Sequence, residues 1–345
     1  MRGRRVIVPN QLQVDLEDFE IDDETLGSRE VLLRTHYTLI SPGTELAIYT
    51  ALDSDVYRSG SWCQYPFHPG YISVGEAIKT GGKVTKMKEG DVVFTYSNHA
   101  SIARVDPAET ICLKLSGGLD GKQALFARMA TIAMTALRVS DGELGDNVAI
   151  FGLGLVGVMA AQLFTLAGMN VIGIDQIDKR LETAEKCGIK CTVNPRKTNV
   201  REKVLELTNG EGCEVTVEAI GNPATVQTCC QITKRLGEVI LLGSPRGEYD
   251  TNLTEILNCV HLWPRGCLTF KGAHEWRYPI HPKEGSKHSI ERNTEIAFRL
   301  ISEGRLRVNE LITHIVKPER IKEAYEGLLN RKEEYLGVIV DWKQE

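Results

Sequence analysis

The sequence predicts an α/β protein in which a doubly wound parallel sheet is joined to a second, β-rich domain. Residues 124–273 alternate between short apolar strands and helical segments, which is typical of a parallel sheet covered by helices. On both sides of this region, β-branched runs are separated by Gly, Pro and Asp, which is typical of strands and turns. We therefore expect one domain at 124–273 and another built from 1–123 together with 274–345.

Each element follows from the local spacing of apolar residues. The first third of the chain has three β-branched runs bounded by turn residues, at 6–8, 30–35 and 91–95. A helix is expected at 124–139, because Ala, Leu and Met recur there at helical spacing. The alternating region predicts strands at 147–151, 170–174, 191–193, 214–218, 238–242 and 269–271. Its helices are expected at 157–167, 179–187, 199–208 and 223–232. The remaining segment predicts helices at 290–302 and 318–329 and strands at 312–316 and 336–341.

Composition and charge exclude several classes of protein. Apolar residues make up 42% of the chain and charged residues 25%, which is ordinary for a globular protein with a substantial core. The formal net charge of -5 gives no attraction to nucleic acid or to an anionic membrane. No run approaches the roughly 18–20 apolar residues that cross a bilayer, and the N-terminal arginines are not followed by the apolar stretch of a signal peptide. We therefore expect a cytoplasmic location.

The cysteines do not form a recognisable framework. There are nine of them, and no C-x-x-C pair occurs. The odd number and the spacing argue against both a disulfide scaffold and a zinc site built from cysteines. We expect buried, reduced thiols.

A glycine-rich turn follows the first strand of the alternating region. The run is Gly152-Leu153-Gly154-Leu155-Val156-Gly157. It has the spacing G-x-G-x-x-G between a strand and a helix, which is the context that makes this motif specific. The first glycine permits a tight turn, the second lets a pyrophosphate approach the backbone, and the third lets helix and strand pack closely. The helix N-terminus offers free N–H groups to the phosphates. The turn therefore predicts a dinucleotide site that includes Leu155 and Val156.

An acidic residue ends the second strand of this region. Asp175 lies about 20 residues beyond the glycine turn, where a carboxylate accepts hydrogen bonds from the adenosine ribose hydroxyls. The same carboxylate would repel a 2′-phosphate, so we expect NAD rather than NADP. Lys179 and Arg180 lie one helical turn further on. Both could contact the adenine or a phosphate of the cofactor, and we predict such a contact for Arg180. The alternative for both is a solvated helix start.

Two later strands also end in small residues. The first is followed by Ala219, within the run 217–221, and the second by Gly243 and Ser244, within the run 241–244. The carboxyl ends of strands in such a sheet face the ligand crevice. We expect these residues to let the nicotinamide half of the cofactor lie close to the backbone.

Three further segments carry a resemblance to a known family. Residues 82–93 resemble a strand–turn–strand pattern ending in G-D-x-V, Met134-Thr135-Ala136-Leu137 resembles a helix that leads into the first nucleotide-domain strand, and Lys271-Gly272-Ala273 resembles a strand used for dimerisation. Together with the glycine turn, they resemble the medium-chain dehydrogenase/reductase superfamily over nearly the whole chain. The resemblance implies a GroES-like catalytic domain, a Rossmann domain, hydride transfer in the cleft between them, and a homodimer or homotetramer. It also predicts a nicotinamide contact for Thr131, which otherwise fits helix packing.

The zinc ligands of that family do not match this sequence. Zinc-dependent members use a cysteine, a histidine in a G-H-E run, and a third Cys or Glu at the start of the linking helix. The corresponding positions are Ser41, Tyr71, and either Ala127 or Arg128. None of these is a plausible zinc ligand there, and the four-cysteine lobe for a structural zinc is missing. We expect a branch of the superfamily without catalytic zinc; the alternative is a remodelled site that uses His68, His99 or Glu45.

Without zinc, side chains must manage the proton and charge of the reaction. The resemblance places Tyr71 where the ligand histidine would be, and Thr44 and Glu45 near the family's proton-relay position. His99 follows the Gly-Asp strand pair, and its imidazole has the best intrinsic acidity for proton transfer. Thr44, Glu45, Tyr71 and His99 are therefore the predicted catalytic residues, although each also fits a structural role.

A polar loop follows the last predicted strand of the alternating region. It contains His274, Glu275, Trp276 and Arg277. An aromatic face with hydrogen-bonding groups suits a polyhydroxylated ring, so we predict that these residues bind substrate; a solvated loop or a subunit contact is the alternative. The expected function is an NAD-dependent, zinc-independent dehydrogenase of a sugar, polyol or cyclitol. The alternatives are a zinc-free NAD(P)H enone or quinone reductase and a catalytically silent dinucleotide-binding protein.

Overall fold

The computed structural model describes residues 1–343 and divides into two compact units. Unit 1 comprises Met1–Arg128, Tyr278–Gly304 and Leu311–Glu345, and unit 2 comprises Met129–Arg277 with Arg305–Glu310. Residues 344–345, which the expected range 274–345 includes, lie outside the described residues. Relative to the expected boundaries, the division lies a few residues later at each end of unit 2. The segment Arg305–Glu310 belongs to unit 2 because Gln162 hydrogen-bonds both the N–H and the carbonyl of Arg307.

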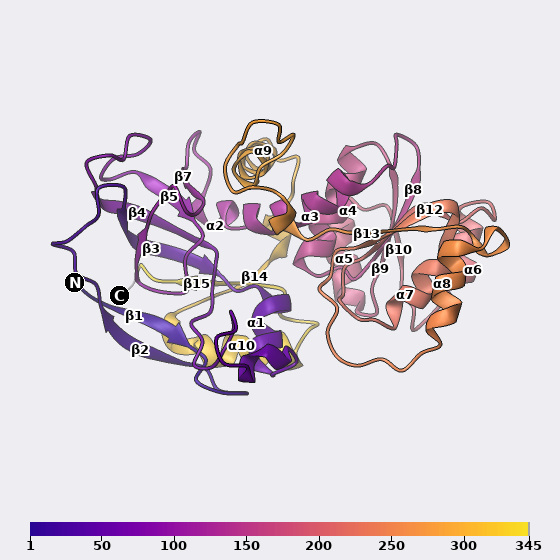
Figure 1. The fold of residues 1–345 in the computed structure, drawn as a ribbon, viewed down its shortest axis with the longest axis horizontal. Coiled ribbons are helices and arrows are strands. Elements are labelled where there is room, and N and C mark those ends of the chain that lie inside the picture. The colour runs from indigo at the N-terminus through magenta and orange to yellow at the C-terminus, as the bar shows by residue number, and fades with distance from the viewer. Residues whose placement is uncertain (344–345) are drawn as a thin grey trace. The chain divides into compact units, whose positions relative to one another are not determined.

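Unit 2 contains a six-stranded parallel sheet in the order β10-β9-β8-β11-β12-β13 (Figure 1). Its strands are β8 (Asn147–Phe151), β9 (Asn170–Ile174), β10 (Cys191–Val193), β11 (Cys213–Glu218), β12 (Thr233–Leu241) and β13 (Thr269–Gly272). All neighbouring pairs are parallel. Numbered along the chain within this sheet, the order is 3-2-1-4-5-6, which is that of a doubly wound dinucleotide-binding fold. The strand order reverses between β8 and β11, where such folds bind their ligand.

Helices connect and cover these strands. They are α3 (Ala127–Val139), α4 (Leu155–Leu166), α5 (Asp178–Lys186), α6 (Val200–Leu207), α7 (Thr225–Ile232) and α8 (Leu253–His261). Ala149 and Phe151 of β8 share one buried cluster with residues of α6 and α7. Alternate residues of a strand point to opposite faces, so α6 and α7 cover one face of the sheet. The predicted fold of an alternating strand and helix region is thereby confirmed.

The structure corrects several expected bounds. The helix expected at 124–139 is two helices, α2 (Gly121–Ala124) and α3. Asp120 caps the start of α2, and between the two helices the N–H groups of Phe126 and Arg128 bond carbonyls three residues back instead of four. Strand β12 begins at Thr233 rather than at residue 238. Helix α8 lies in a stretch, 243–268, for which no element was predicted.

Unit 1 is β-rich. A seven-stranded sheet runs in the order β14-β15-β3-β4-β5-β7, with β6 paired to β3, and β1 and β2 form a separate antiparallel pair. The strands are β1 (Arg2–Ile7), β2 (Asp15–Glu20), β3 (Val31–Leu39), β4 (Ser73–Thr80), β5 (Val92–Thr95), β6 (Ile102–Val105), β7 (Cys112–Lys114), β14 (Ile312–Val316) and β15 (Gly337–Asp341). Its other helices are α1 (Pro42–Tyr49), α9 (Ile290–Ser302) and α10 (Ile321–Asn330). The pairing of β15 with β3 joins the two ends of the chain in one sheet.

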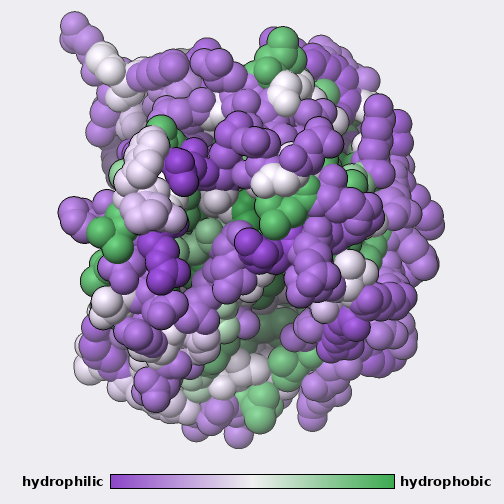
Figure 2. Space-filling view, turned by 90° about the vertical axis from the view of Figure 1, so that its right-hand side faces the viewer, coloured by the Kyte–Doolittle hydropathy of each residue, from purple (hydrophilic) through white to green (hydrophobic). Residues whose placement is uncertain are grey.

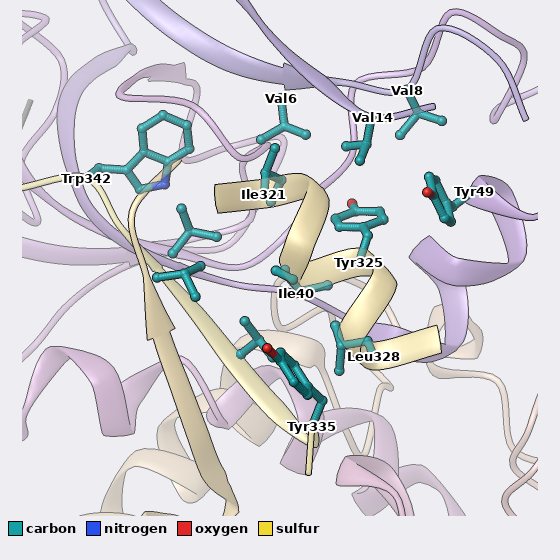
Figure 3. Packing of buried hydrophobic residues seen from close by; sticks show 14 residues of the cluster. Val6, Val8, Val14, Ile40, Tyr49, Ile321, Tyr325, Leu328, Tyr335 and Trp342 are labelled. Atoms are coloured by element: carbon teal, nitrogen blue, oxygen red, sulfur yellow. The ribbon is translucent and has the colours of Figure 1, made fainter. Parts of the chain in front are cut away.

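One core of unit 1 packs α10 against the strands and α1. Figure 3 shows Ile321, Tyr325 and Leu328 projecting from α10 toward Ile40, Tyr49 and the N-terminal strand residues. The Tyr49 and Tyr325 rings meet edge to face at 5.3 Å, a favoured aromatic geometry. The spacing 321, 325, 328 places all three side chains on one face of α10. This core fixes α10 beside α1, which carries part of the candidate site.

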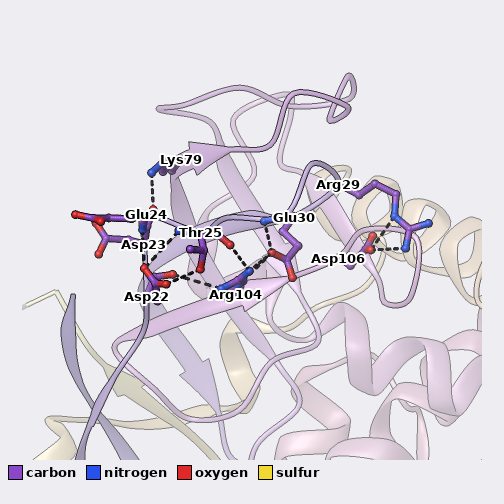
Figure 4. A network of polar contacts seen from close by, with 10 residues as sticks. Asp22, Asp23, Glu24, Thr25, Arg29, Glu30, Lys79, Arg104 and Asp106 are labelled. Atoms are coloured by element: carbon purple, nitrogen blue, oxygen red, sulfur yellow. Dashed lines mark hydrogen bonds and ion pairs between the residues drawn. The ribbon is translucent and has the colours of Figure 1, made fainter.

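A surface network stabilises another edge of unit 1. Arg104 bonds the carboxylate of Glu30 and the carbonyls of Asp22 and Thr25 (Figure 4). Arg29 pairs with Asp106 nearby. Exposed pairs of this kind add little each, so the network orders the turn at residues 22–25 more than it stabilises the fold. Within residues 1–343, no helix is long and apolar enough to cross a membrane.

We expect Leu328→Ala to destabilise unit 1 by about 2–5 kcal/mol, because it leaves a cavity in a core that excludes solvent. Leu328 is 3% exposed, whereas the control residue Leu52 is 54% exposed. Urea unfolding followed by circular dichroism measures both variants. Equal midpoints for Leu328→Ala and Leu52→Ala would contradict this account of the core.

Candidate cofactor site and active site

The glycine turn after β8 is closed by a backbone contact that only glycine permits. A Cβ on Gly157 would lie 1.7 Å from the carbonyl oxygen of Gly152, so the first turn of α4 rests directly on the end of β8. Gly152 has φ +87°, a conformation that side chains rarely adopt. A Cβ on Gly154 would meet nothing within 4 Å. The turn therefore has one tightly packed end and one open position, as a phosphate cradle requires.

The N-terminus of α4 lies at this open position. Gly154 is its N-cap and contributes no side-chain hydrogen bond. The first N–H groups of a helix have no partner within the helix, so those of Leu155 and Val156 are available to an anion. Leu155 is buried and Val156 is half-buried. The residues present fit the pyrophosphate of a dinucleotide.

Asp175 is fixed against the same turn. Its Oδ2 accepts the N–H of Leu153 at 2.8 Å, and its Oδ1 accepts the N–H of Ile177 at 2.9 Å. Arg180 lies beside it, with Nη1 at 3.7 Å from Oδ2. A carboxylate has about four acceptor positions, so two remain beyond these backbone bonds. The carboxylate is thus both an anchor for the turn and a group able to receive ribose hydroxyls.

Glu218 organises the neighbouring strand ends, a role that the sequence analysis did not assign. Its carboxylate accepts the N–H groups of Ile220 and Gly221. Burial raises the pKa of Glu218, and these backbone bonds oppose that rise. A Cβ on Gly243 would lie 2.2 Å from the nitrogen of Gly221, so the ends of β11 and β12 meet backbone to backbone. The signal in the sequence was an acidic residue at the end of a strand, three positions before Gly221.

Other predicted cofactor residues lie in unit 2 as follows. Ala219 is half-buried, and its N–H donates to the carbonyl of Phe151, which brings the ends of β11 and β8 together. Ser244 is exposed at the end of β12. Thr131 is buried on α3, and its carbonyl accepts the hydroxyl of Thr135.

The polar loop after β13 forms a short 3-10 turn at Glu275–Arg277. His274, Trp276 and Arg277 are exposed, whereas Glu275 is buried. Arg277 donates from Nη1 to the carbonyl of Gly272 at 2.7 Å, which holds the loop against the end of the strand. Three of the four predicted substrate-binding residues therefore offer their side chains to solvent.

In unit 1, the structure brings together the three positions at which the resemblance implies zinc ligands. The Tyr71 hydroxyl donates to Ser41 Oγ. The Arg128 guanidinium lies over the Tyr71 ring, with its central carbon 5.1 Å from the ring centroid. Ala127, the other option for the third position, is completely buried. The donor set is thus a serine, a tyrosine and a permanent cation, which does not fit Zn²⁺.

Arg128 was not among the residues predicted to be catalytic. It contacts the Tyr96 ring as well, at 4.2 Å, and donates from Nη1 to the Tyr96 hydroxyl at 3.1 Å. Guanidinium–aromatic contacts of this kind contribute about 2 kcal/mol when desolvated. The sequence did not distinguish Arg128 from Ala127, because a one-residue gap in the comparison with the family places either of them at the third zinc-ligand position.

Glu45 and His99 meet inside the core of unit 1. Glu45 is 2% exposed and His99 is 0% exposed. Glu45 Oε2 lies 3.0 Å from His99 Nε2 and accepts the Tyr325 hydroxyl at 2.5 Å, while Oε1 accepts the N–H of Ser41 at 2.7 Å. Burial raises the pKa of Tyr325, and the Glu45 carboxylate raises it further, so Tyr325 donates rather than ionises. This cluster fixes Ser41, and Thr44 lies half-buried on the same helix.

No group of three His, Cys, Asp or Glu side chains within residues 1–343 is arranged to hold a metal ion. His68, which the remodelled-site alternative would use, lies 2.8 Å from Glu17 on β2. Glu45 and His99 pair with each other. The three side chains of that alternative therefore have other partners in the described part of the chain.

Comparison with known proteins agrees with this architecture. A family model described as zinc-binding dehydrogenase matches residues 156–279. D-guloside 3-dehydrogenase of Shigella flexneri is 26% identical over 328 residues, which cover 89% of this chain and 91% of that protein. L-threonine 3-dehydrogenase of Escherichia fergusonii is 26% identical over 271 residues, which cover 69% of this chain and 76% of that protein.

A solved structure shares the whole fold. Galactitol-1-phosphate dehydrogenase from Escherichia coli superimposes with a TM-score of 0.80 at 18% identity, covering 98% of this chain and 99% of that one. At this identity the likeness concerns the fold alone. The family model and the relatives confirm the resemblance that the motifs carry to the medium-chain dehydrogenase/reductase superfamily, and they support an oxidoreductase.

Proposed function

We propose that this protein is an NAD-dependent, zinc-independent dehydrogenase that oxidises a secondary alcohol of a sugar, polyol or cyclitol, or catalyses the reverse reduction. The observation that carries the proposal is the replacement of a plausible zinc-ligand set by Ser41, Tyr71 and Arg128, in a chain whose glycine turn fits a dinucleotide. The bound dinucleotide would accept or return the hydride. The protein's own residues would bind and orient the substrate and exchange its hydroxyl proton.

The preference for NAD rests on Asp175. Its carboxylate is held in place by the N–H groups of Leu153 and Ile177, so it cannot turn away from a ribose without breaking both bonds. A fixed negative charge at this point accepts hydroxyl hydrogen bonds and repels a 2′-phosphate. Arg180 partly offsets that charge at 3.7 Å. The net effect favours NAD, while Arg180 limits the size of the preference.

The substrate class rests on two supports. D-guloside 3-dehydrogenase, by its name, acts on a sugar derivative, and it is related over 89% of this chain. The exposed side chains of His274, Trp276 and Arg277 offer an aromatic face and hydrogen-bonding groups, a combination that suits a polyhydroxylated ring. The proposed substrate is therefore a small polyol-like molecule.

Among the four predicted catalytic side chains, Tyr71 is best suited to contact substrate. Glu45 and His99 are enclosed in the core and hydrogen-bonded to each other, so we assign them the task of positioning Ser41. Tyr71 is half-buried and presents a hydroxyl beside Ser41. Thr44 is also half-buried, one residue before Glu45. We propose that Tyr71 exchanges the substrate proton.

We further propose that the protein is a cytoplasmic homodimer. Leu253, Leu257 and Val260 of α8 are exposed at a spacing that places them on one helix face, and β13 forms the outer edge of the parallel sheet. Edge strands pair readily with a second copy. Figure 2 views the α8 end of the molecule, where separate hydrophobic groups lie among hydrophilic side chains. All nine cysteines are free, which suits a reducing compartment.

The wild-type protein should bind NADH at least about tenfold more tightly than NADPH, a difference of about 1.4 kcal/mol. Gly154→Ala should weaken the binding of both, because its methyl group would enter the open position of the turn. Gly82→Ala is the matched control, since a Cβ there also meets nothing within 4 Å. Fluorescence titration measures all three proteins. Tighter binding of NADPH by the wild type would reject the proposed preference, and unchanged affinities for Gly154→Ala would reject the cradle.

Purified protein should oxidise at least one polyol or sugar with NAD⁺ after exhaustive chelation, and elemental analysis should find well below one zinc per chain. The donor set of Ser41, Tyr71 and Arg128 offers zinc no thiolate or imidazole. A panel of secondary alcohols and ketones measures the activity. Near-stoichiometric zinc, with activity lost on chelation and restored by zinc, would overturn the ligand assignment. Tight NADH binding without turnover across the panel would instead favour a catalytically silent protein.

Leu257→Glu should shift the protein from dimer to monomer, because it places a charge in the apolar face of α8. Leu52→Glu is a matched control, because the two leucines are 55% and 54% exposed. Light scattering coupled to size-exclusion chromatography gives the mass of each variant. A dimer that persists in Leu257→Glu would show that α8 lies outside the interface.

A further inference from the structure

Arg128 places a positive charge over the ring of Tyr71, whose hydroxyl donates to Ser41 Oγ. Its guanidinium lies over the Tyr71 ring at 5.1 Å and over the Tyr96 ring at 4.2 Å. The residue is 5% exposed. A guanidinium stays charged at all accessible pH values, and its field acts more strongly in such surroundings than in water.

Hydrogen bonds from the core fix the position of the Tyr71 and Ser41 hydroxyls. The buried Glu45 carboxylate accepts the N–H of Ser41, and Ser41 Oγ accepts the Tyr71 hydroxyl. The Tyr71 oxygen is therefore held at Ser41, on the ring over which the guanidinium lies. Tyr71 is only half-buried, so a ligand and water are able to reach it even though Ser41 and Arg128 are enclosed.

We propose that Arg128 is a positioning residue whose charge stabilises the anionic form of the Tyr71 oxygen, so that the Tyr71–Ser41 pair exchanges the substrate proton without a metal. This inference rests on the proposed dehydrogenase function. It explains why a cation lies where a zinc ion would otherwise supply positive charge, and why Ser41 is anchored by a buried carboxylate.

The proposed step balances as follows. In the oxidation, the C–H bond of the carbinol would break and its electron pair would leave as a hydride, which a bound NAD⁺ would accept. The O–H bond breaks, its proton goes to the Tyr71 oxygen, and its electron pair forms the carbonyl. The neutral Tyr71 hydroxyl, hydrogen-bonded to Ser41, then releases the proton to water. In the reduction, Tyr71 donates the proton to the carbonyl oxygen as the hydride arrives.

A purely structural role for Arg128 would consist of holding the Tyr71 and Tyr96 rings apart. Two variants separate the effect of the charge of Arg128 from the effect of its shape. Arg128→Lys keeps a positive charge but loses the planar fork, whereas Arg128→Met keeps a comparable length without charge. Glu45 and His99 pair with each other and Glu45 accepts the N–H of Ser41, while the Tyr96 hydroxyl accepts from Arg128. Tyr96→Phe therefore controls for a second titrating phenol.

The test measures tyrosinate formation by ultraviolet absorbance as pH is raised, in the protein without cofactor. The step that disappears in Tyr71→Phe belongs to Tyr71. We expect Arg128→Met to move this step upward by more than about one pH unit, a change of about 1.4 kcal/mol, while Arg128→Lys moves it less. Tyr96→Phe should leave the step present. An unchanged step in Arg128→Met, or equal shifts in both variants, would overturn the proposal.

Kinetics supply the second measurement. Arg128→Met should lower kcat with NAD⁺ at least about a hundredfold and shift the rising limb of the kcat/KM profile to higher pH, with NADH affinity unchanged within about twofold. Arg128→Lys should recover part of the rate. Arg2→Met removes a surface arginine on β1 and should match the wild type. A wild type that does not turn over would reject the dehydrogenase function, whereas the absorbance titration would still decide the role of Arg128.

Discussion

The buried carboxylate of Glu45 is the interaction on which unit 1 and its candidate active site depend. A polar group buried in a protein core costs free energy unless it is hydrogen-bonded. Here the bonds come from segments far apart in the sequence: Ser41 before α1, His99 after β5, and Tyr325 on α10. Hydrogen-bonding the two oxygens of this one side chain therefore fixes the relative positions of three segments. Ser41, and through it Tyr71, is placed as a consequence.

Carboxylates perform the same task in unit 2. Asp175 accepts backbone N–H groups on both sides of the glycine turn, and Glu218 accepts them from the turn after β11. Such bonds to charged acceptors are stronger than those between neutral groups. They hold the turns in one shape before any ligand arrives, which lowers the entropy lost on binding. The contact between Gly157 and Gly152 completes this preorganisation, because no other residue lets α4 approach β8 so closely.

The candidate sites of the two units thus contain charged side chains of opposite sign. Unit 2 uses acidic side chains to hold backbone loops around an anion site at a helix N-terminus, where the N–H groups supply the positive end. Unit 1 places a cation, Arg128, over the rings of two tyrosines, one of which donates its hydroxyl to Ser41. In the proposed function, a guanidinium lies where zinc-using relatives would hold the metal, and proton transfer between side chains would take the place of Lewis-acid polarisation.

The sequence by itself determined the elements whose signal is local. The alternation of strands and helices, the strands 147–151, 170–174 and 191–193, and the glycine spacing all follow from short-range periodicity and from turns that require glycine. The resemblance to the family identified Ser41 and Tyr71, because they lie within short motifs that can be aligned to it. Only the tertiary structure chose Arg128 over Ala127, since adjacent helix residues point about 100° apart and the chain has to fold before one of them meets Tyr71. It also enclosed Glu45 and His99 in the core, because their partners lie 54 and 280 residues from Glu45, and no local pattern records a contact over that distance.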